Sequence, residues 1–187
     1  MNPILGIIAS SKLAASNAYE SIATTTVGGG GASSVTFSSI PSTYQHLQIR
    51  LIARTDSGGT QGFIRLTYNN VTTANYTEHG LYGDGSAAAA AGSTGNNSGI
   101  VQRTAGGTSL SNTFGAVVLD ILDYASTNKY KTERSLGGVD LNGAGLIGLY
   151  STALYSTTDA INRIDLTPNS GSFVQYSSFA LYGIKGA

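Results

Sequence analysis

The chain of 187 residues contains no cysteine and no tryptophan, and few of its side chains are charged. Charged residues make up 11% of the sequence, against about 25% in a typical soluble domain, and ten basic residues balance ten acidic ones. Without cysteine, disulfides, thiolate metal sites and thiol nucleophiles are excluded. A net charge of zero provides no basic surface for nucleic acid, so no nucleic-acid partner is expected. The two histidines, His46 and His79, are too few for a multi-histidine metal site, and we expect no metal and no cofactor.

Long hydrophobic runs are also missing. The apolar run near the start extends from Ile4 to Ala9, whereas a membrane helix needs about 20 residues. No basic residue precedes this run, as one would in a signal peptide, because Lys12 comes after it. The sequence therefore predicts neither membrane insertion nor a secretory signal.

The first 18 residues are predicted to form an N-terminal arm, and residues 19–187 a β-sandwich domain. The arm is rich in apolar side chains but precedes the first predicted strand of the sandwich. Apolar side chains outside a core need another surface to cover them, since burying each contributes roughly 1.5–3 kcal/mol. We therefore expect the arm to serve attachment or oligomerisation through Ile4, Leu5, Ile7, Ile8 and Leu13.

What the chain has in excess is glycine, serine and threonine, which together exceed a third of its residues. These are poor helix formers, so a helical bundle is not expected. The 41% apolar content is regularly patterned, which argues against disorder. The clearest pattern lies in residues 46–54, where Leu47, Ile49 and Leu51 alternate with other residues at a period of two, as in a strand with one buried face.

Comparable segments recur with turns every eight to twelve residues, and we predict eight to ten strands. This spacing is typical of a two-sheet sandwich, so the predicted fold class is all-β: an antiparallel, jelly-roll-like β-sandwich. The face with Leu47, Ile49 and Leu51 is expected to pack against Ile64 and Leu66 or their sheet partners. Neighbouring segments are expected to pair as hairpins, namely 19–27 with 34–40 and 46–54 with 61–68.

Regular patterning is lost between residues 69 and 107. Residues 85–99 are of low complexity, with no side chain larger than asparagine. Glycine and alanine bury too little apolar area to offset the entropy of ordering a segment. We predict that residues 83–99 form an exposed, mobile loop.

Acid and base groups cluster with aromatic residues in one place, at Glu78 and His79 near Asp84. Two carboxylates that flank a sugar could act as general acid and nucleophile. The alternative is a polar loop anchored by its aromatic neighbours. The sequence contains no G-x-S-x-G elbow, P-loop or dinucleotide fingerprint, and we expect no enzymatic activity and no catalytic residues.

Two further groups of charges invite a functional interpretation. Asp120 and Asp123 lie within an apolar strand and are either calcium ligands or outer-face residues. A run of charged residues contains Lys129, Lys131, Glu133 and Arg134. It either contacts an acidic partner or forms a solvated face with its charges partly paired.

Eleven tyrosines remain to be explained. Tyrosine among serine, asparagine and glycine is common in recognition loops, because it supplies a large contact area at a low entropy cost. Tyrosine rings also stack on sugar rings, although core and sheet-face packing is the alternative for most of them. As glycan-contact candidates we single out Tyr76, His79 and Tyr82.

Several stretches of the chain resemble small virion proteins of tailed phages, described as tail-fibre, head-fibre or other structural proteins. The matching stretches are YESIATTTVGGGGASSVTFSSIPSTYQHLQIRLIAR, YTEHGLYGDGS, NTFGAVVLDILDYASTNKYKTERSL and TPNSGSFVQYSSFALYGIKG, which together cover most of the chain from residue 19 onward. The resemblance implies a jelly-roll-like β-sandwich displayed on a virion, with no catalytic residues. It implies other virion proteins and further copies of this chain as partners, in a trimer.

Two functions follow as hypotheses. The first is a non-enzymatic virion structural protein of a tailed phage, as head decoration, head fibre or tail appendage, assembled in multiple copies on the particle exterior. The second is a tail-fibre adhesion module that binds a glycan on the host surface. The two overlap, since an appendage can also bind.

Overall fold

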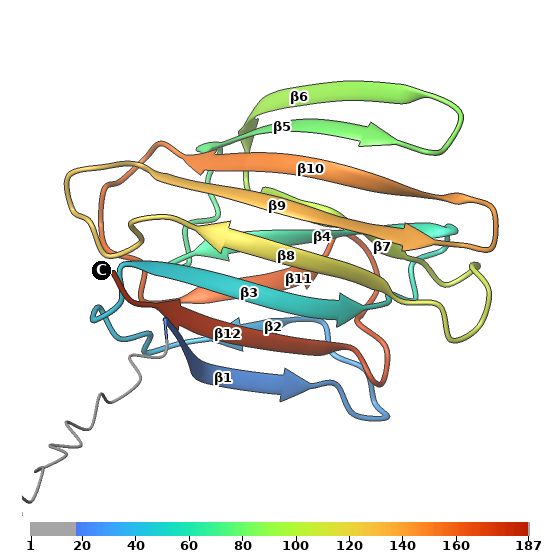
Figure 1. The fold of residues 1–187 in the computed structure, drawn as a ribbon, viewed down its shortest axis with the longest axis horizontal. Helices are drawn as coiled ribbons and strands as arrows, with labels where there is room; N and C mark the ends of the chain where they lie inside the picture. Colours follow the sequence, from blue (N-terminus) through green and yellow to red (C-terminus); the bar gives the residue numbers. More distant parts are fainter. Residues whose placement is uncertain (1–17, 187) are drawn as a thin grey trace, which may run out of the picture.

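The computed structural model describes residues 18–186, which form twelve strands and no helix (Figure 1). In chain order the strands are β1 (Tyr19–Thr26), β2 (Val35–Phe37), β3 (His46–Ala53), β4 (Gln61–Tyr68), β5 (Tyr76–Gly83), β6 (Ala88–Asn96), β7 (Gly99–Ala105), β8 (Gly115–Ile121), β9 (Lys131–Asp140), β10 (Gly145–Leu154), β11 (Ile164–Pro168) and β12 (Ser178–Ile184). Within residues 18–186, no helix has the length and apolar character needed to cross a bilayer.

The strands form two antiparallel sheets that stack face to face (Figure 1). One sheet has eight strands in the order β1-β12-β3-β8-β9-β10-β5-β6, and the other has four in the order β2-β11-β4-β7. The predicted antiparallel β-sandwich is thus confirmed. The strands outnumber the eight to ten expected, because segments without an apolar pattern also pair.

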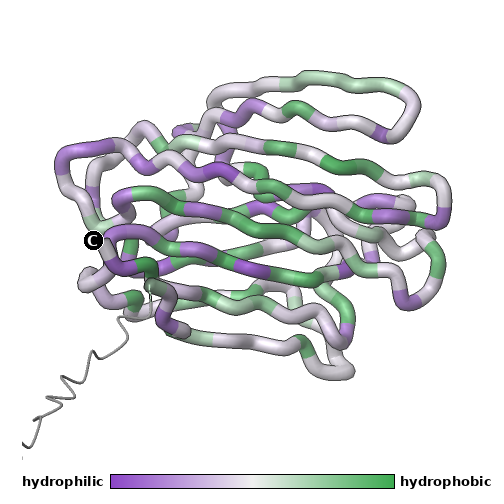
Figure 2. Tube along the Cα trace, in the orientation of Figure 1, coloured by the Kyte–Doolittle hydropathy of each residue, from purple (hydrophilic) through white to green (hydrophobic). Residues whose placement is uncertain are grey.

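The core lies between the sheets and follows the predicted alternation. Leu47, Ile49 and Leu51 of β3 are buried, and so are Ile64 and Leu66 of β4. All five belong to one hydrophobic cluster, which confirms the assignment of faces. Figure 2 shows how apolar residues recur along the strands of the larger sheet.

The predicted hairpins are wrong. β3 pairs with β12 and β8, while β4 lies in the other sheet between β11 and β7. Likewise β1 pairs with β12, and β2 pairs with β11. The glycine-rich links therefore cross between sheets, because turn residues permit a crossing as readily as a hairpin and the partners are set by contacts distant in sequence.

Residues 83–99 are mostly exposed, as predicted, but the prediction that they form a loop is wrong. Residues 83–99 contain β6, which pairs with β5 in an antiparallel ladder that has one register shift, between Tyr76 and Glu78. Asp84 organises the turn between them, as its Oδ1 accepts hydrogen bonds from the backbone N–H groups of Ser86 and Ala87 at 2.9 and 2.8 Å. β6 is exposed along nearly its whole length, so backbone pairing and not burial orders it. Such pairing leaves no signature in side-chain hydropathy.

The interpretation of the charge run as a solvated face is wrong for two of its members. Lys131 and Glu133 point into the sandwich and are 1% and 2% exposed, whereas Arg134 faces outward. The ammonium group of Lys131 donates to the backbone carbonyls of Ser126, Lys129 and Thr158, which replaces its hydration. The alternation of β9 therefore places charge inside and Leu136 outside.

Candidate functional site

A cleft of about 260 Å³ opens between the β5–β6 hairpin, at one end of the larger sheet, and the β4–β7 end of the smaller sheet. Its lining combines aromatic rings, guanidinium groups and a carboxylate: Phe63, Tyr82, Tyr150, Arg65, Arg103 and Glu78. On β4 the alternation buries Ile64 in the core and turns its two neighbours in sequence to the opposite face. The cleft is thus separate from the hydrophobic core.

The Arg103 guanidinium lies between two aromatic rings. Its Cζ is 4.9 Å from the ring centre of Phe63, its cross-strand neighbour on β4, and 4.4 Å from that of Tyr82 on β5. Cation–π contacts of this kind hold the guanidinium plane and favour arginine over lysine. The stack links the two sheets and fixes a row of hydrogen-bond donors in the cleft.

Two glycines make room for the Tyr150 ring. A Cβ at Gly80 would lie 2.5 Å from its Cε1, and a Cβ at Gly148 would lie 2.8 Å from its Cε2. Tyr150 is 4% exposed and nearly parallel to Tyr82, with ring centres 6.4 Å apart and an angle of 9°. Burial raises the pKa of Tyr150, so its hydroxyl stays protonated at neutral pH.

A partly buried ion pair forms the second link between the sheets. Arg65 Nη1 on β4 donates to Glu78 Oε2 on β5 at 2.8 Å, and the side chains are 22% and 16% exposed. Ser93 on β6 donates to the other carboxylate oxygen at 3.0 Å. Because each carboxylate oxygen accepts a hydrogen bond from a different residue, the Glu78 carboxylate is held in one orientation.

Three of the six buried side-chain atoms without a hydrogen-bond partner among the described residues lie at this cleft. Among the described residues, Arg65 Nε, Arg103 Nε and the Tyr150 hydroxyl are buried without a hydrogen-bond partner. A buried polar group without a partner costs about 1–3 kcal/mol. Two guanidinium groups and one carboxylate give the cleft a local positive charge, so a ligand rich in oxygen acceptors fits it.

The glycan-contact candidates fall in three different environments. Tyr76 is fully buried, and its hydroxyl donates to Val71 O and accepts from the backbone N–H of Tyr68. The prediction that Tyr76 contacts a glycan is therefore wrong. Tyr82 lines the cleft, and the exposed His79 lies at its rim beside Gly92. For these two residues glycan contact stays a prediction.

The attachment candidates, Ile4, Leu5, Ile7, Ile8 and Leu13, lie outside the described residues. Their role in attachment or oligomerisation stays a prediction.

Phe63, Arg65, Arg103 and Tyr150 were not predicted as site residues. They come from three strands that are far apart in the sequence, and no motif joins them. A faint signal was present in Arg65 and Arg103, each a single charge within an otherwise uncharged strand.

The structure separates the carboxylates that sequence analysis considered as a catalytic pair. Glu78 and Asp84 lie six residues apart, about 20 Å along an extended chain, whereas glycosidase pairs are about 5–9.5 Å apart. Backbone hydrogen bonds from Ala87 and Ser86 lower the pKa of Asp84 to about 2, so it is a turn residue that stays ionised.

The aspartates considered as calcium ligands have other partners. Asp120 faces outward on β8, where it accepts from Gln48 at 2.8 Å and pairs with Arg134 at 3.4 Å. Asp123 lies in the turn after β8 and pairs with Lys129 and His46. In the part of the chain that the structure describes, no three His, Asp or Glu side chains group as metal ligands.

Comparison with known proteins finds no matching family model and no matching curated protein. Among solved structures, the chain is similar to galectin LEC-6 from Caenorhabditis elegans, at 11% sequence identity and a TM-score of 0.32. The match covers 84% of this chain and 94% of the galectin chain.

Proposed function

We propose that the protein is a non-enzymatic, glycan-binding β-sandwich module and that the cleft at the β5–β6 hairpin is its sugar site. A sugar ring presents an apolar C–H face and a rim of hydroxyl groups. A matching site needs aromatic surface beside fixed donors and acceptors, as in other small-molecule sites. The observation that supports this function most directly is the stack of Phe63, Arg103 and Tyr82. It lies next to the Arg65–Glu78 ion pair.

The dimensions of the cleft support a small ligand. Its volume of about 260 Å³ lies just below the range of about 300–1,000 Å³ for small-molecule sites. One terminal sugar residue suits this volume better than a long chain. The local positive charge favours a sugar that carries a carboxylate or many accepting oxygens.

A glycan array tests this function with the full-length protein and two single variants. Tyr82→Ala removes one side of the arginine stack, and we expect it to weaken binding at least tenfold, about 1.4 kcal/mol. The matched control is Tyr176→Ala, because this ring is 70% exposed and lies outside the cleft. Absence of binding to any glycan, or equal binding by both variants, would contradict the proposal.

We also propose that the module works as a virion structural protein on the exterior of a tailed phage, in several copies and beside other virion proteins. The stretches that resemble such proteins support this location. A neutral chain supports it as well, since a net charge near zero favours association. Mass spectrometry of purified particles should detect the chain in stoichiometric amounts, and its absence from particles would overturn the assignment.

A further inference from the structure

The outward side of the eight-stranded sheet carries an apolar surface that the core does not explain. Six large aliphatic side chains on this side are between 41% and 64% exposed. We call these residues the apolar face: Ile52, Leu81, Val118, Leu136, Ile147 and Leu149.

Four of them form a continuous row across neighbouring strands. Val118 on β8 lies opposite Leu136 on β9, Leu136 opposite Leu149 on β10, and Leu149 opposite Leu81 on β5. Directly opposite residues have Cβ atoms about 4.5–5.5 Å apart, so the row is unbroken over four strands. Singly scattered apolar residues are normal on a surface, but a contiguous patch marks an interaction site.

Part of β9 has the reverse of the alternation expected for a strand that faces the core. It turns Glu133 and Ser135 into the sandwich and Leu136 to the outside. A strand that served only the core would place leucine inward and the carboxylate outward. Where a sequence breaks this local rule, a functional constraint is the expected reason.

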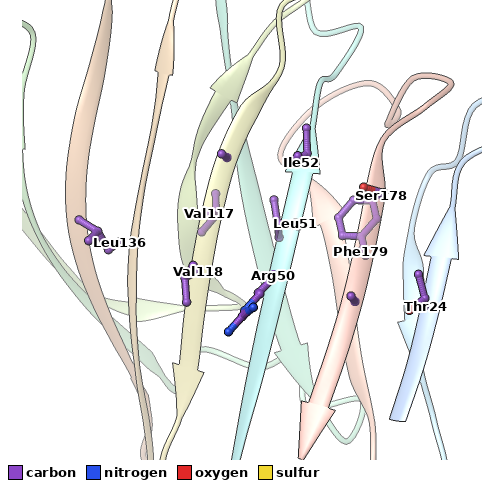
Figure 3. A pocket seen from close by; sticks show the side chains of 11 residues that line it. Thr24, Arg50, Leu51, Ile52, Val117, Val118, Leu136, Ser178 and Phe179 are labelled. Atoms are coloured by element: carbon purple, nitrogen blue, oxygen red, sulfur yellow. The ribbon is translucent and has the colours of Figure 1, made fainter. Parts of the chain in front are cut away.

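A hollow lies beside the row. The apolar face therefore has both a protruding row and a recess, the two parts that a self-complementary contact needs. The hollow measures about 400 Å³, and its small side chains include Ala116, Ala180 and Ser178, while Val118 and Leu136 border it (Figure 3). A contact between two copies related by a two-fold axis uses the same patch on both, so the patch must hold protrusions and matching recesses. The apolar row and this hollow meet that requirement.

The charge on this face also suits a second copy. The one charged side chain lining the hollow, Arg50, is held in place by uncharged neighbours: Nε donates to Gln48 at 2.8 Å, and Cζ lies over the rings of Tyr19 and Tyr182 at 5.4 and 5.3 Å. These contacts occupy the guanidinium within its own chain, so a partner of opposite charge is not required.

The area is sufficient for a stable pair. The whole outer side of the eight-stranded sheet, with the apolar face on its five strands β3, β8, β9, β10 and β5, presents roughly 900 Å² for strands about 4.8 Å apart and about seven residues long. A stable interface takes about 800 Å² from each partner.

We propose that the apolar face packs against the apolar face of a second copy of this chain. Such a contact gives even-numbered assemblies, in place of the expected trimer, and it leaves free the cleft residues Glu78 and Tyr82, which lie on the other side of β5 from Leu81.

The full-length chain tests this pairing by light scattering and sedimentation velocity. The wild type should have twice the chain mass of 19.1 kDa at the highest soluble concentration. Leu136→Lys with Leu149→Lys should weaken association at least tenfold, without loss of the folded circular dichroism spectrum. The control Leu110→Lys changes an exposed leucine outside the apolar face and should leave association unchanged.

Three outcomes would overturn the proposal: a monomeric wild type, a trimer, or a double-lysine variant that is folded and still dimeric. The double variant Ile7→Lys with Ile8→Lys tests whether the N-terminal residues, and not the apolar face, hold the copies together. If this variant is monomeric while Leu136→Lys with Leu149→Lys is still dimeric, the interface lies at the N-terminal residues and the proposal is contradicted.

Cross-linking supplies an independent readout, because the chain has no cysteine of its own. Ala116→Cys lies in the hollow and should cross-link between copies with a short bismaleimide, since packed sheets lie about 10 Å apart. Thr36→Cys lies on the four-stranded sheet, is exposed and should not cross-link. Equal cross-linking at both positions would contradict a specific face-to-face pair.

Discussion

Glu133 shows at the residue scale how this core departs from an apolar one. Its carboxyl group is 2% exposed, and among the described residues neither oxygen has a hydrogen-bond partner. The buried Tyr68 hydroxyl is likewise unpartnered. Burial raises the pKa of Glu133 well above its usual value and also raises that of Tyr68. The folded protein therefore holds the proton on Glu133 more tightly than the unfolded chain does.

Glu133→Gln should make the protein relatively more stable as the pH rises. A carboxyl whose folded pKa is raised contributes its full stability below the unfolded pKa and loses it as the pH rises toward the folded pKa. The free energy of unfolding of the wild type should therefore fall relative to the variant above about pH 4.5, by up to about 1.4 kcal/mol per pH unit. Urea titrations of both proteins between pH 4 and pH 8 measure this difference. A difference that does not change with pH would show that Glu133 does not titrate in this way.

Ile49→Ala should destabilise the protein by roughly 2–5 kcal/mol, the usual loss for truncating a buried aliphatic side chain. Ile49 is fully buried, whereas Leu122, in the turn after β8, is 44% exposed. Leu122→Ala is therefore the control and should change the free energy of unfolding by less than about 0.5 kcal/mol. Similar losses in both variants, measured by urea denaturation, would contradict the assignment of the β3 face.

At the scale of elements, strand character was predictable wherever one face meets the core. The alternation of β3 predicts its buried face because that information is local. The sheet partners were not predictable, since a glycine-rich link fits either a hairpin or a crossing between sheets. β6 was missed because alanine and glycine give no hydropathy pattern, and backbone pairing with β5 orders them.

The same limit applied to the candidate site. Tyr82 and His79 were predicted from local composition, but Arg65 and Arg103 reach the cleft through the pairing of β4 with β7. Tyr76 was misassigned because an aromatic residue in a polar segment gives no sign of its burial. Local chemistry therefore identified the β5 segment, and only the fold identified its partners.

Gly80→Ala tests how strictly β5 shapes the cleft. The added methyl group would meet the Tyr150 ring at 2.5 Å, so we expect a loss of about 1–3 kcal/mol in stability and weaker glycan binding. Gly58→Ala is the control, because a Cβ there has no atom within 4 Å. Thermal denaturation and the glycan array measure the two effects. Unchanged binding by a folded Gly80→Ala variant would show that the Tyr150 ring does not shape the sugar site.

At the scale of the whole molecule, the sandwich separates three surfaces. The core lies between the sheets, the cleft opens where the hairpin meets the β4–β7 end of the smaller sheet, and the apolar face covers the outside of the larger sheet. Glu78 and Tyr82 face the cleft from one side of β5, whereas Leu81 of the apolar face and the rim residue His79 lie on the other side. Binding of a ligand and pairing of copies can therefore occur together, which suits a module displayed in several copies.

The central claim is that the cleft binds a glycan, and a crystal structure of the protein with its best array ligand tests it most directly. The claim predicts density for a sugar residue in the cleft, in contact with Tyr82 and Arg103 and with an oxygen within hydrogen-bond distance of the guanidinium group. Sugar density at another surface, with the cleft closed by the same side-chain contacts as in the free protein, would contradict it.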